Sequence, residues 1–356
     1  MTKTLRAPAR AFALVPAALL ALAATDASAC ATCGCSLSTD AATGFPARPG
    51  WNVSLQYDFI DQSQLRHGDK AVSTADVAAI NDAGGDQEVE HDTVNRYTTL
   101  GIGWMPSDDW GLRLLVPWVD RGHSTYASAT NPVTGDQLST ARIKGLGDIR
   151  LLATWQGLLE DHSLGLQLGL KLPTGHYGGA NADGTGVVGR RPTTFGRGPL
   201  SQNDSPDNLV DTSLQAGTGS TDIIVGAYWH QPIGHSMEAF VNGQYQAAIA
   251  NRLHGAGQDF RVGNTTFVSF GARWEATPTL LPQVQVNIAH KGADQGALAD
   301  NPDSEGTVVY LSPGVTGTFA DHWQAFGFVQ LPVASHLVGY QLAPRWTASA
   351  GLSYAF

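Results

Sequence analysis

The chain has 356 residues, of which 41 are Gly and 9 are Trp, and only 15% of its residues are charged. Soluble domains average about 7% Gly and about 25% charged residues, and Gly disfavours helices, so the composition argues against an ordinary helical enzyme. The Trp content excludes a disordered chain, and the net charge of −10 excludes an electrostatic surface for nucleic acid.

The first 29 residues have the pattern of a signal peptide. Lys3, Arg6 and Arg10 form a basic region, residues 11–24 are apolar, and the small residues at 27–29 form a cleavage signal. The apolar region is too short for a membrane-anchoring helix, and no later stretch is apolar for long enough to be one. We therefore expect export, with cleavage after residue 29.

Three cysteines follow directly, at Cys30, Cys33 and Cys35, in the spacing C-x-x-C-x-C. An odd number of cysteines leaves at least one thiol unpaired within an exported chain. No His follows in the C-x-x-C-H spacing, which disfavours covalent haem. Three interpretations stay open: a disulfide within the chain or to a partner, lipidation of Cys30, and a soft-metal site for Cu(I) or Zn²⁺ formed by the three thiolates.

Long segments of strict period-two alternation begin after residue 50. They run for about 11–14 residues, whereas strands of soluble proteins run for about 5–6. Residues 164–172, for example, alternate Leu with Gly, Gln and Lys. Twelve such segments can be counted, at residues 51–61, 93–105, 109–121, 146–156, 162–174, 220–232, 236–249, 263–276, 280–291, 306–319, 322–333 and 344–356.

The connections between these segments alternate between long and short. The long ones are residues 62–92, 122–145, 175–219, 250–262, 292–305 and 334–343. An even strand number with long loops on one side and tight turns on the other describes an outer-membrane barrel. We therefore predict an all-β fold, a transmembrane antiparallel β-barrel of about 12 strands in a Gram-negative outer membrane, with long extracellular loops and both termini periplasmic. The predicted division is a signal peptide (1–29), a Cys-bearing periplasmic segment (30–50) and the barrel (51–356).

Aromatic residues support this orientation. Seven of the nine Trp lie near the predicted periplasmic strand ends, and only Trp118 and Trp346 lie near the outer ends. Indole rings prefer the membrane–water interface, so this sorting predicts an aromatic girdle. The final Phe356, at the end of an alternating strand, resembles the C-terminal signal that such barrels present to the barrel assembly machinery.

Two short motifs carry a resemblance to a known family. The sequence L-K-L-P-T-G at 170–175 and, after a long loop, L-Q-A-G-T-G-S at 214–220 with Asp222 resemble the outer-membrane transporter family named for the meta-pathway of phenol degradation. The motifs are structural Gly, Pro and Thr positions, so the resemblance implies no catalytic or ligand residue. It implies an outer-membrane channel, often for small and frequently hydrophobic organic compounds.

Alternate residues of a strand point to opposite faces of the sheet, and this strand parity predicts which charged side chains face the lumen. A charge on the lipid face costs about 2–4 kcal/mol at the midplane, so these side chains must point inward. The predicted lumen-lining residues are Asp58, Arg113, Asp148, Arg150, Lys171, Asp222, Glu238, Arg273, Glu275 and Arg345. These residues could form either a plug of ion pairs or the lining of a narrow polar pore. Barrels of about 8 strands are filled by side chains and those of about 16 leave an aqueous channel, so about 12 strands do not decide between the two.

Acidic residues cluster in two of the long loops, at positions 82–92 and 294–305. Carboxylates are ligands for Ca²⁺ or Mg²⁺, but the spacing is not that of an EF-hand. The favoured interpretation is a solvated acidic loop.

The function predicted from the sequence is a channel or transporter for small solutes, including small hydrophobic or aromatic compounds. The alternative is a non-conducting barrel that anchors a periplasmic redox or soft-metal partner through Cys30, Cys33 and Cys35. An enzyme is not expected, because G-x-S-x-G is absent and parity does not bring the Ser and His of G-H-S at 122–124 or 234–236 together. The expected partners are outer-membrane lipid, lipopolysaccharide, the assembly machinery and a small solute, with no cofactor besides the soft metal.

Overall fold

The computed structural model describes residues 49–85, 87–126, 132–202 and 208–356. The predicted signal peptide and Cys30, Cys33 and Cys35 lie outside the described residues. The predictions for them therefore stay predictions.

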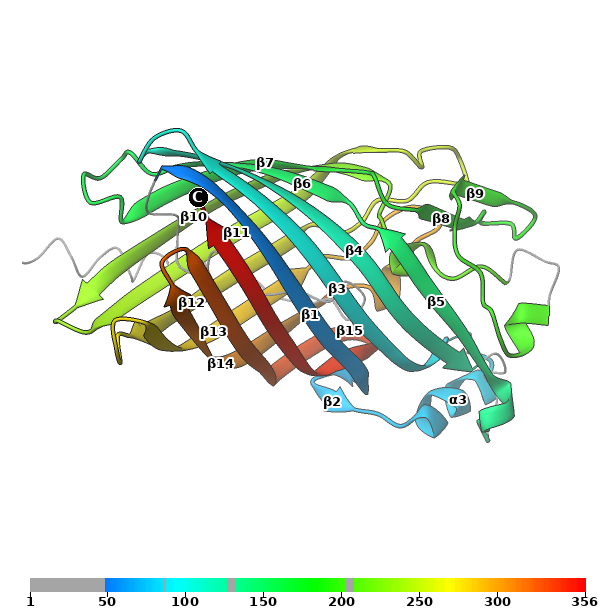
Figure 1. Cartoon of the computed structure of the whole chain (residues 1–356). Coiled ribbons are helices and arrows are strands. Elements are labelled where there is room, and N and C mark those ends of the chain that lie inside the picture. The colour runs from blue at the N-terminus through cyan, green and yellow to red at the C-terminus, as the bar shows by residue number, and fades with distance from the viewer. Residues whose placement is uncertain (1–48, 86, 127–131, 203–207) are drawn as a thin grey trace, which may run out of the picture.

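The described chain is built almost entirely of strands (Figure 1). The strands are β1 (Gly50–Gly68), β2 (Lys70–Ala71), β3 (Val89–Met105), β4 (Trp110–Tyr126), β5 (Leu138–Leu146), β6 (Ile149–Trp155), β7 (Leu164–Leu172), β8 (Tyr177–Ala180), β9 (Val187–Arg190), β10 (Ser220–Ile233), β11 (Met237–Asn251), β12 (Thr265–Trp274), β13 (Leu280–Lys291), β14 (Gly306–Ala320) and β15 (Trp323–Ala355). The helices are α3 (Thr74–Asp82) and the single 3₁₀ turns η1 (Gly135–Gln137), η2 (Pro199–Gln202), η4 (Thr212–Leu214) and η5 (Asn301–Asp303). Within the described residues, no helix combines the length and the apolar character that a transmembrane helix needs.

Eleven strands pair with their neighbours in chain order, and β15 pairs with β1, so the antiparallel sheet closes into a barrel. The strand β15 crosses the wall twice. Its first half pairs with β14 and its second half with β1, and the Ala355 N–H donates to the His322 carbonyl at 3.0 Å. The turn between the halves contains Gly339, whose φ of 71° only Gly adopts readily. The predicted antiparallel barrel of about twelve strands is confirmed.

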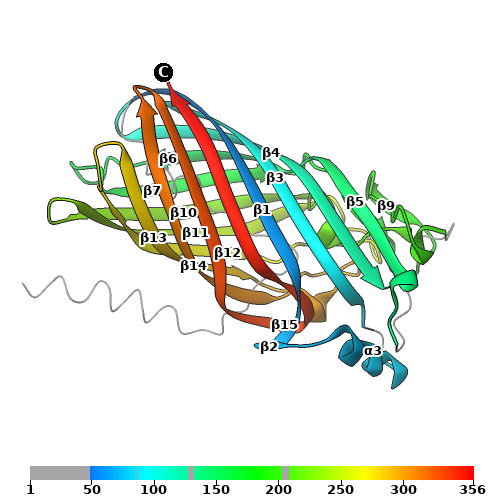
Figure 2. The same ribbon diagram turned by 60° about the horizontal axis from the view of Figure 1, so that its bottom comes forward.

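The two ends of the barrel differ. Short turns join the strands at one end, the turn end, where the Phe356 N–H donates to the Trp51 carbonyl at 2.8 Å. At the opposite end, the long-loop end, α3, β8 and β9 lie in long connections (Figures 1 and 2). The described chain therefore begins and ends at the turn end.

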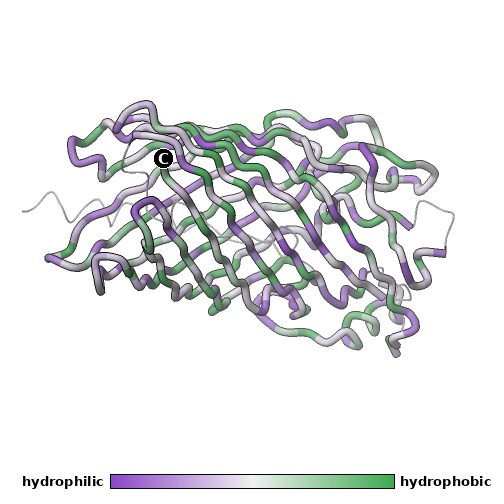
Figure 3. The backbone as a smooth tube through the Cα atoms, in the orientation of Figure 1, coloured by the Kyte–Doolittle hydropathy of each residue, from purple (hydrophilic) through white to green (hydrophobic). Residues whose placement is uncertain are grey.

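Hydrophilic and hydrophobic residues alternate along the strands (Figure 3). Because successive side chains point to opposite faces, the wall has two different faces. Along β7, Leu166, Leu168, Leu170 and Leu172 are exposed on the outside, while the residues between them are buried toward the lumen. Lipid accepts such an apolar outer face, and closure leaves no unpaired sheet edge within it. The distribution identifies a membrane-spanning barrel.

Tryptophans mark the turn end, as the sequence predicts. Trp51 pairs with Trp104 across β1 and β3, with ring centroids 5.7 Å apart, and Trp110 pairs with Trp155 across β4 and β6, at 6.3 Å. Their indoles are positioned to form the interfacial girdle of this rim.

The connection predicted as a loop over 62–92 contains additional structure. The helix α3 begins at a capping box, in which Ser73 and Asp76 satisfy each other's backbone N–H groups. Val77 and Ala78 on this helix are buried against Leu65 of β1 and a hydrophobic cluster that includes β3 and β15. This packing fixes the connection to the long-loop end of the barrel.

Two other predicted loops are also wrong in extent. Residues 122–126 continue β4 and residues 138–145 belong to β5, so the hairpin extends well beyond the predicted strand ends. Residues 334–343 are mostly paired strand within β15. The outward positions here are polar or Gly, such as Asp120, Gly122 and Arg142, and therefore the hydrophobic alternation disappears while the ladder of backbone hydrogen bonds continues.

Candidate functional site

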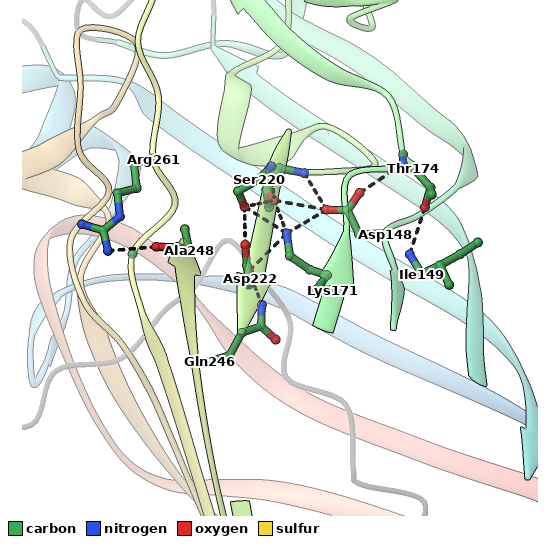
Figure 4. Close-up of polar contacts among 12 residues, drawn as sticks. Asp148, Ile149, Lys171, Thr174, Ser220, Asp222, Gln246, Ala248 and Arg261 are labelled. Atoms are coloured by element: carbon green, nitrogen blue, oxygen red, sulfur yellow. Dashed lines mark hydrogen bonds and ion pairs between the residues drawn. The ribbon is translucent and has the colours of Figure 1, made fainter. Parts of the chain in front are cut away.

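The inner wall of the barrel carries a buried ion-pair network centred on Lys171 (Figure 4). The Lys171 Nζ lies 2.9 Å from Asp148 Oδ2 and 3.2 Å from Asp222 Oδ2. Lys171 on β7 and Asp222 on β10 are direct register partners, while Asp148 lies at the break between β5 and β6. All three side chains are buried, so one cation holds two carboxylates on the lumen side of three neighbouring strands.

The two motifs of the family resemblance meet at this network. Asp148 accepts hydrogen bonds from the Gly175 N–H and the Thr218 N–H, each at 3.0 Å. A side chain at Gly217 would place its Cβ 2.5 Å from Asp148 Oδ1 and 2.8 Å from the Gly175 Cα. The two glycines therefore allow the backbones on either side of the long connection to touch, and Asp148 ties them together.

The long connection between these motifs folds back against the inner wall. Phe195, Val210 and Leu214 pack on a buried cluster formed by β4 and β5. Arg121, on the inner face of β4, donates to the carbonyl oxygens of Leu214 and Gln215 and, at 2.8 Å, to the Tyr97 hydroxyl. The segment 208–218 therefore narrows the lumen toward the long-loop end. Sequence reasoning did not predict this folding, because the segment has no periodic pattern.

The inner wall beyond β10 is lined by amides. The Gln283 amide donates to Gln285 at 2.8 Å, and the Asn287 amide donates to Ser312 at 2.9 Å and to Gln330 at 2.8 Å. Some polar atoms of this wall have no hydrogen-bond partner among the described residues, namely Asn242 Oδ1, Ser269 Oγ, Gln285 Nε2 and Gln330 Nε2. These atoms are buried, so the amides make this wall polar without exposing these four atoms to the lumen.

Other predicted lumen residues also lie on the inner face. Asp58 is 1% exposed and accepts hydrogen bonds from Ser349 at 2.6 Å and Gln56 at 2.9 Å. Glu238 forms an ion pair with Arg273 at 3.1 Å. These three contacts lie on either side of the network around Lys171, at β1 and β15 and at β11 and β12.

The remaining residues predicted to line the lumen differ in position and exposure. Arg113 is half-buried on β4, and Arg150, the register partner of Lys171, is exposed on the same face. Glu275 does not lie within a strand: it is exposed in the turn after β12, because β12 ends at Trp274. Arg345 is exposed at a bulge where β15 shifts its register against β1, so simple parity does not fix its direction.

Acidic side chains of three long connections converge at the long-loop end. This acidic cluster consists of Glu88, Glu90, Asp211, Asp300 and Asp303. Burial, together with Asp303 and Glu88, raises the pKa of Asp300 to about 7, and burial together with Glu88 raises the pKa of Asp211. Among the described residues, no group of three or more His, Cys, Asp or Glu is arranged to hold a metal ion.

The interpretation of these loops as merely solvated is wrong. Asp294 is 0% exposed and lies 2.7 Å from Lys291 Nζ, Glu90 accepts from the Leu342 N–H at 3.2 Å, and Asp303 accepts from the Tyr340 N–H. Through these ion pairs and hydrogen bonds, the carboxylates hold the long connections against one another and against the strand ends.

Ser124, of the G-H-S tripeptide at 122–124, does contact a His, although not the His of that tripeptide. Ser124 Oγ lies 3.0 Å from His91 Nδ1, and the same nitrogen lies 2.7 Å from Asp92 Oδ1. The register shift between β3 and β4 brings them together, which parity alone did not predict. A Ser-His-Asp triad uses one ring nitrogen for each partner, so this arrangement does not have triad geometry.

No protein-family model matches the chain, and no curated protein matches it. Among solved structures, an outer-membrane channel from Pseudomonas putida F1 superposes with a TM-score of 0.58 at 12% identity, over 90% of this chain and 100% of that one. A Pseudomonas aeruginosa FadL homologue has a TM-score of 0.42 at 10% identity, over 93% and 99% of the two chains. The P. putida toluene transporter has a TM-score of 0.41 at 10% identity, over 87% and 91%.

The first of these similarities supports the fold derived from the strand register. It agrees with the fold implied by the motifs at 170–175 and 214–222, which form the anchored base of the long connection. The chain therefore has the fold of an outer-membrane β-barrel channel.

Proposed function

We propose that the protein is a channel for small solutes in a Gram-negative outer membrane, with its long-loop end extracellular and its termini periplasmic. The observation that supports it best is the inner wall. It carries hydrogen-bonded amides, a compact ion-pair network and the exposed cation Arg150 on its inner face, inside an apolar outer face.

The class of solute follows from the resemblance and the channel-like fold. Small organic compounds, including hydrophobic or aromatic ones, suit a lumen that the segment 208–218 narrows and that Phe240, Phe326 and Phe328 line together with polar groups. The similarity of the fold to an outer-membrane channel is consistent with transport of such a solute.

Single-channel recording in planar bilayers tests the proposal. Wild-type protein should conduct, and Arg150→Gln should shift the reversal potential in a salt gradient toward cation selectivity, because it removes an exposed positive charge from the inner face. Arg252→Gln, in an exposed loop outside the barrel wall, serves as the control. A folded wild-type barrel without conductance would contradict the proposal.

The proposal includes the surroundings of such a barrel. Its partners are outer-membrane lipid, lipopolysaccharide, the assembly machinery that recognises the strand ending at Phe356, and the solute. No catalytic role is proposed. A soft metal at Cys30, Cys33 and Cys35 is proposed from their spacing alone, in a segment that precedes the barrel.

A further inference from the structure

Four basic side chains gather on the outer wall near the long-loop end, although the chain has a net charge of −10. Arg96 lies on β3, and Arg142 and Lys144 lie on β5. Arg197 belongs to the long connection at the free edge of β5, where the Thr140 N–H donates to the Arg197 carbonyl at 2.9 Å. Figure 2 shows β3, β4 and β5 side by side at this end.

The strand register shows that the side chains on β3 and β5 point away from the lumen, and Arg197 lines the same cleft as Arg96 and Arg142. Arg96 pairs with Phe59 and with Asp120, and Asp120 pairs with Lys144. Asp120 shares its face of β4 with Trp118, which is 52% exposed on the lipid side. Direct partners in antiparallel strands point to the same face, so the whole row lies on the outside.

A cleft of about 510 Å³ separates the three arginines. Arg96, Arg142 and Arg197 line it, and Gly122 and Gly196 also belong to its lining. A Cβ at Gly122 would meet no atom within 4 Å, so the cleft is open at this point. Asp120 pairs with Arg142 at 2.8 Å and with Lys144 at 3.5 Å. Asp120 contacts two of the four cations but neutralises only one unit of charge, so the cleft keeps a positive charge.

The height of the cleft relative to the membrane follows from the same strands. Trp118 and its partner Leu146 are exposed and apolar, and the next outward pair toward the long-loop end is Asp120 with Lys144. This step from apolar to charged marks the membrane boundary, where Trp is favoured. The arginines therefore lie just beyond the hydrocarbon, at the depth of lipid headgroups.

We propose that this cleft binds a phosphate group of a phosphorylated glycolipid of the outer leaflet, that is, of lipopolysaccharide. Planar guanidinium groups bind phosphate through paired hydrogen bonds, and three of them converge on one opening. The exposed Trp118 and Leu146 below the cleft provide an apolar surface for the acyl chains of the same lipid. The inference deepens the proposed function, because it rests on the outer-membrane location and orientation.

The test measures lipid binding to the full-length, detergent-purified protein by native mass spectrometry. The probes are bis-phosphorylated lipid A, dephosphorylated lipid A and inorganic phosphate. The variants are the triple substitution Arg96→Gln/Arg142→Gln/Arg197→Gln and Gly122→Trp, which fills the cleft without changing its charge. Arg252→Gln is the matched control, and circular dichroism checks folding.

Wild type and the control should bind bis-phosphorylated lipid A, and both cleft variants should bind it about tenfold or more weakly. Inorganic phosphate should not displace the lipid, and dephosphorylated lipid should bind as weakly to wild type as to the variants. Equal affinity of a folded triple variant, or equal binding of dephosphorylated lipid, would overturn the inference. Displacement by inorganic phosphate would overturn the assignment to a lipid.

Conductance in bilayers without lipopolysaccharide separates this result from the proposed function. The cleft variants should conduct like wild type, because none of the substituted side chains lines the lumen. A conducting wild type without charge-dependent lipid binding rejects the cleft alone. Charge-dependent lipid binding by a barrel that does not conduct rejects the channel alone.

Discussion

Lys171 is a buried cation of the inner wall. It is 3% exposed and contacts two carboxylates, Asp148 at the break between β5 and β6 and Asp222 on β10. Lys171→Met should lower the free energy of unfolding by about 3–5 kcal/mol, because it leaves buried carboxylates without their cation. Urea unfolding followed by circular dichroism measures it.

Arg150 provides the matched control for this substitution. It is the register partner of Lys171 on the same face but is exposed, so Arg150→Met should change the stability by no more than about 0.5 kcal/mol. Equal losses in the two variants would show that the burial of the Lys171 ion pairs does not matter.

The three cysteines carry a second prediction at this scale. Thiolates compete between disulfide exchange and soft-metal binding, and C-x-x-C-x-C places three of them within six residues. Reduced protein that retains Cys30, Cys33 and Cys35 should bind about one Cu(I) or Zn²⁺ per chain, and Ser at all three positions should abolish binding. Elemental analysis measures the metal. A stable disulfide or an acylated Cys30 in the native protein, without metal, would contradict it.

At the scale of elements, the long connection between β7 and β10 is held by close backbone contact rather than by secondary structure. Gly217→Val would force a side chain into Asp148 and Gly175 and should cost about 1–3 kcal/mol. The segment 208–218 should then leave the inner wall, and the single-channel conductance should rise. Gly243→Ala is the control, since a Cβ there meets nothing within 4 Å. An unchanged conductance in a destabilised Gly217→Val barrel would show that this segment does not narrow the lumen.

The acidic cluster makes the packing of these connections dependent on pH. Burial and the neighbouring Asp303 raise the pKa of Asp300 to about 7, so the folded loops hold a proton that the unfolded loops release above about pH 4. Their stability should be complete below about pH 4 and should fall as the pH rises toward 7. Hydrogen exchange of residues 292–305, corrected for its intrinsic pH dependence, measures this, and Asp300→Asn should reduce the effect.

Asp183 offers a control of opposite sign for that experiment. Its hydrogen bonds with Thr185 lower its pKa, so any contribution it makes is present at neutral pH and is lost in acid. Asp183→Asn should leave the exchange of residues 292–305 between pH 4 and 7 unchanged. A wild-type protein whose exchange is independent of pH in this window would contradict the role of Asp300.

At the scale of the whole molecule, the sequence predicts the strands of the barrel wall well. It predicts poorly the structure of the long connections and the segment folded into the lumen. The strand β13 has the predicted bounds, and β10, β11 and β14 differ by one or two residues, because lipid outside and water inside impose strict alternation. The capped helix α3, the extension of β4 into β5 and the inward fold of 208–218 depend on contacts between distant segments, such as Arg121 with Leu214, which no local pattern encodes.

The candidate site shows the same division. Parity predicts that Asp58, Lys171 and Asp222 share the inner wall, because their strands are regular. It does not predict which of them pair, since Lys171 meets Asp148 only through the break between β5 and β6. For Glu275 and Arg345 the alternation passes a strand end and a bulge, where it no longer predicts the direction of the side chain.

The orientation of the whole barrel in the membrane is the last prediction. Gly184 and Gly234 both occupy tight turns with positive φ, of 67° and 68°, but at opposite ends: one between β8 and β9, the other between β10 and β11. A protease recognition sequence inserted at Gly184 should be cut by protease added to intact cells, and the same sequence at Gly234 should be cut only after the outer membrane is permeabilised. Such exposed turns tolerate insertion, and immunoblotting reads the cleavage. Cleavage at Gly234 but not at Gly184 in intact cells would invert the barrel, and the basic cleft at Arg96, Arg142 and Arg197 would then face the periplasmic leaflet instead of lipopolysaccharide.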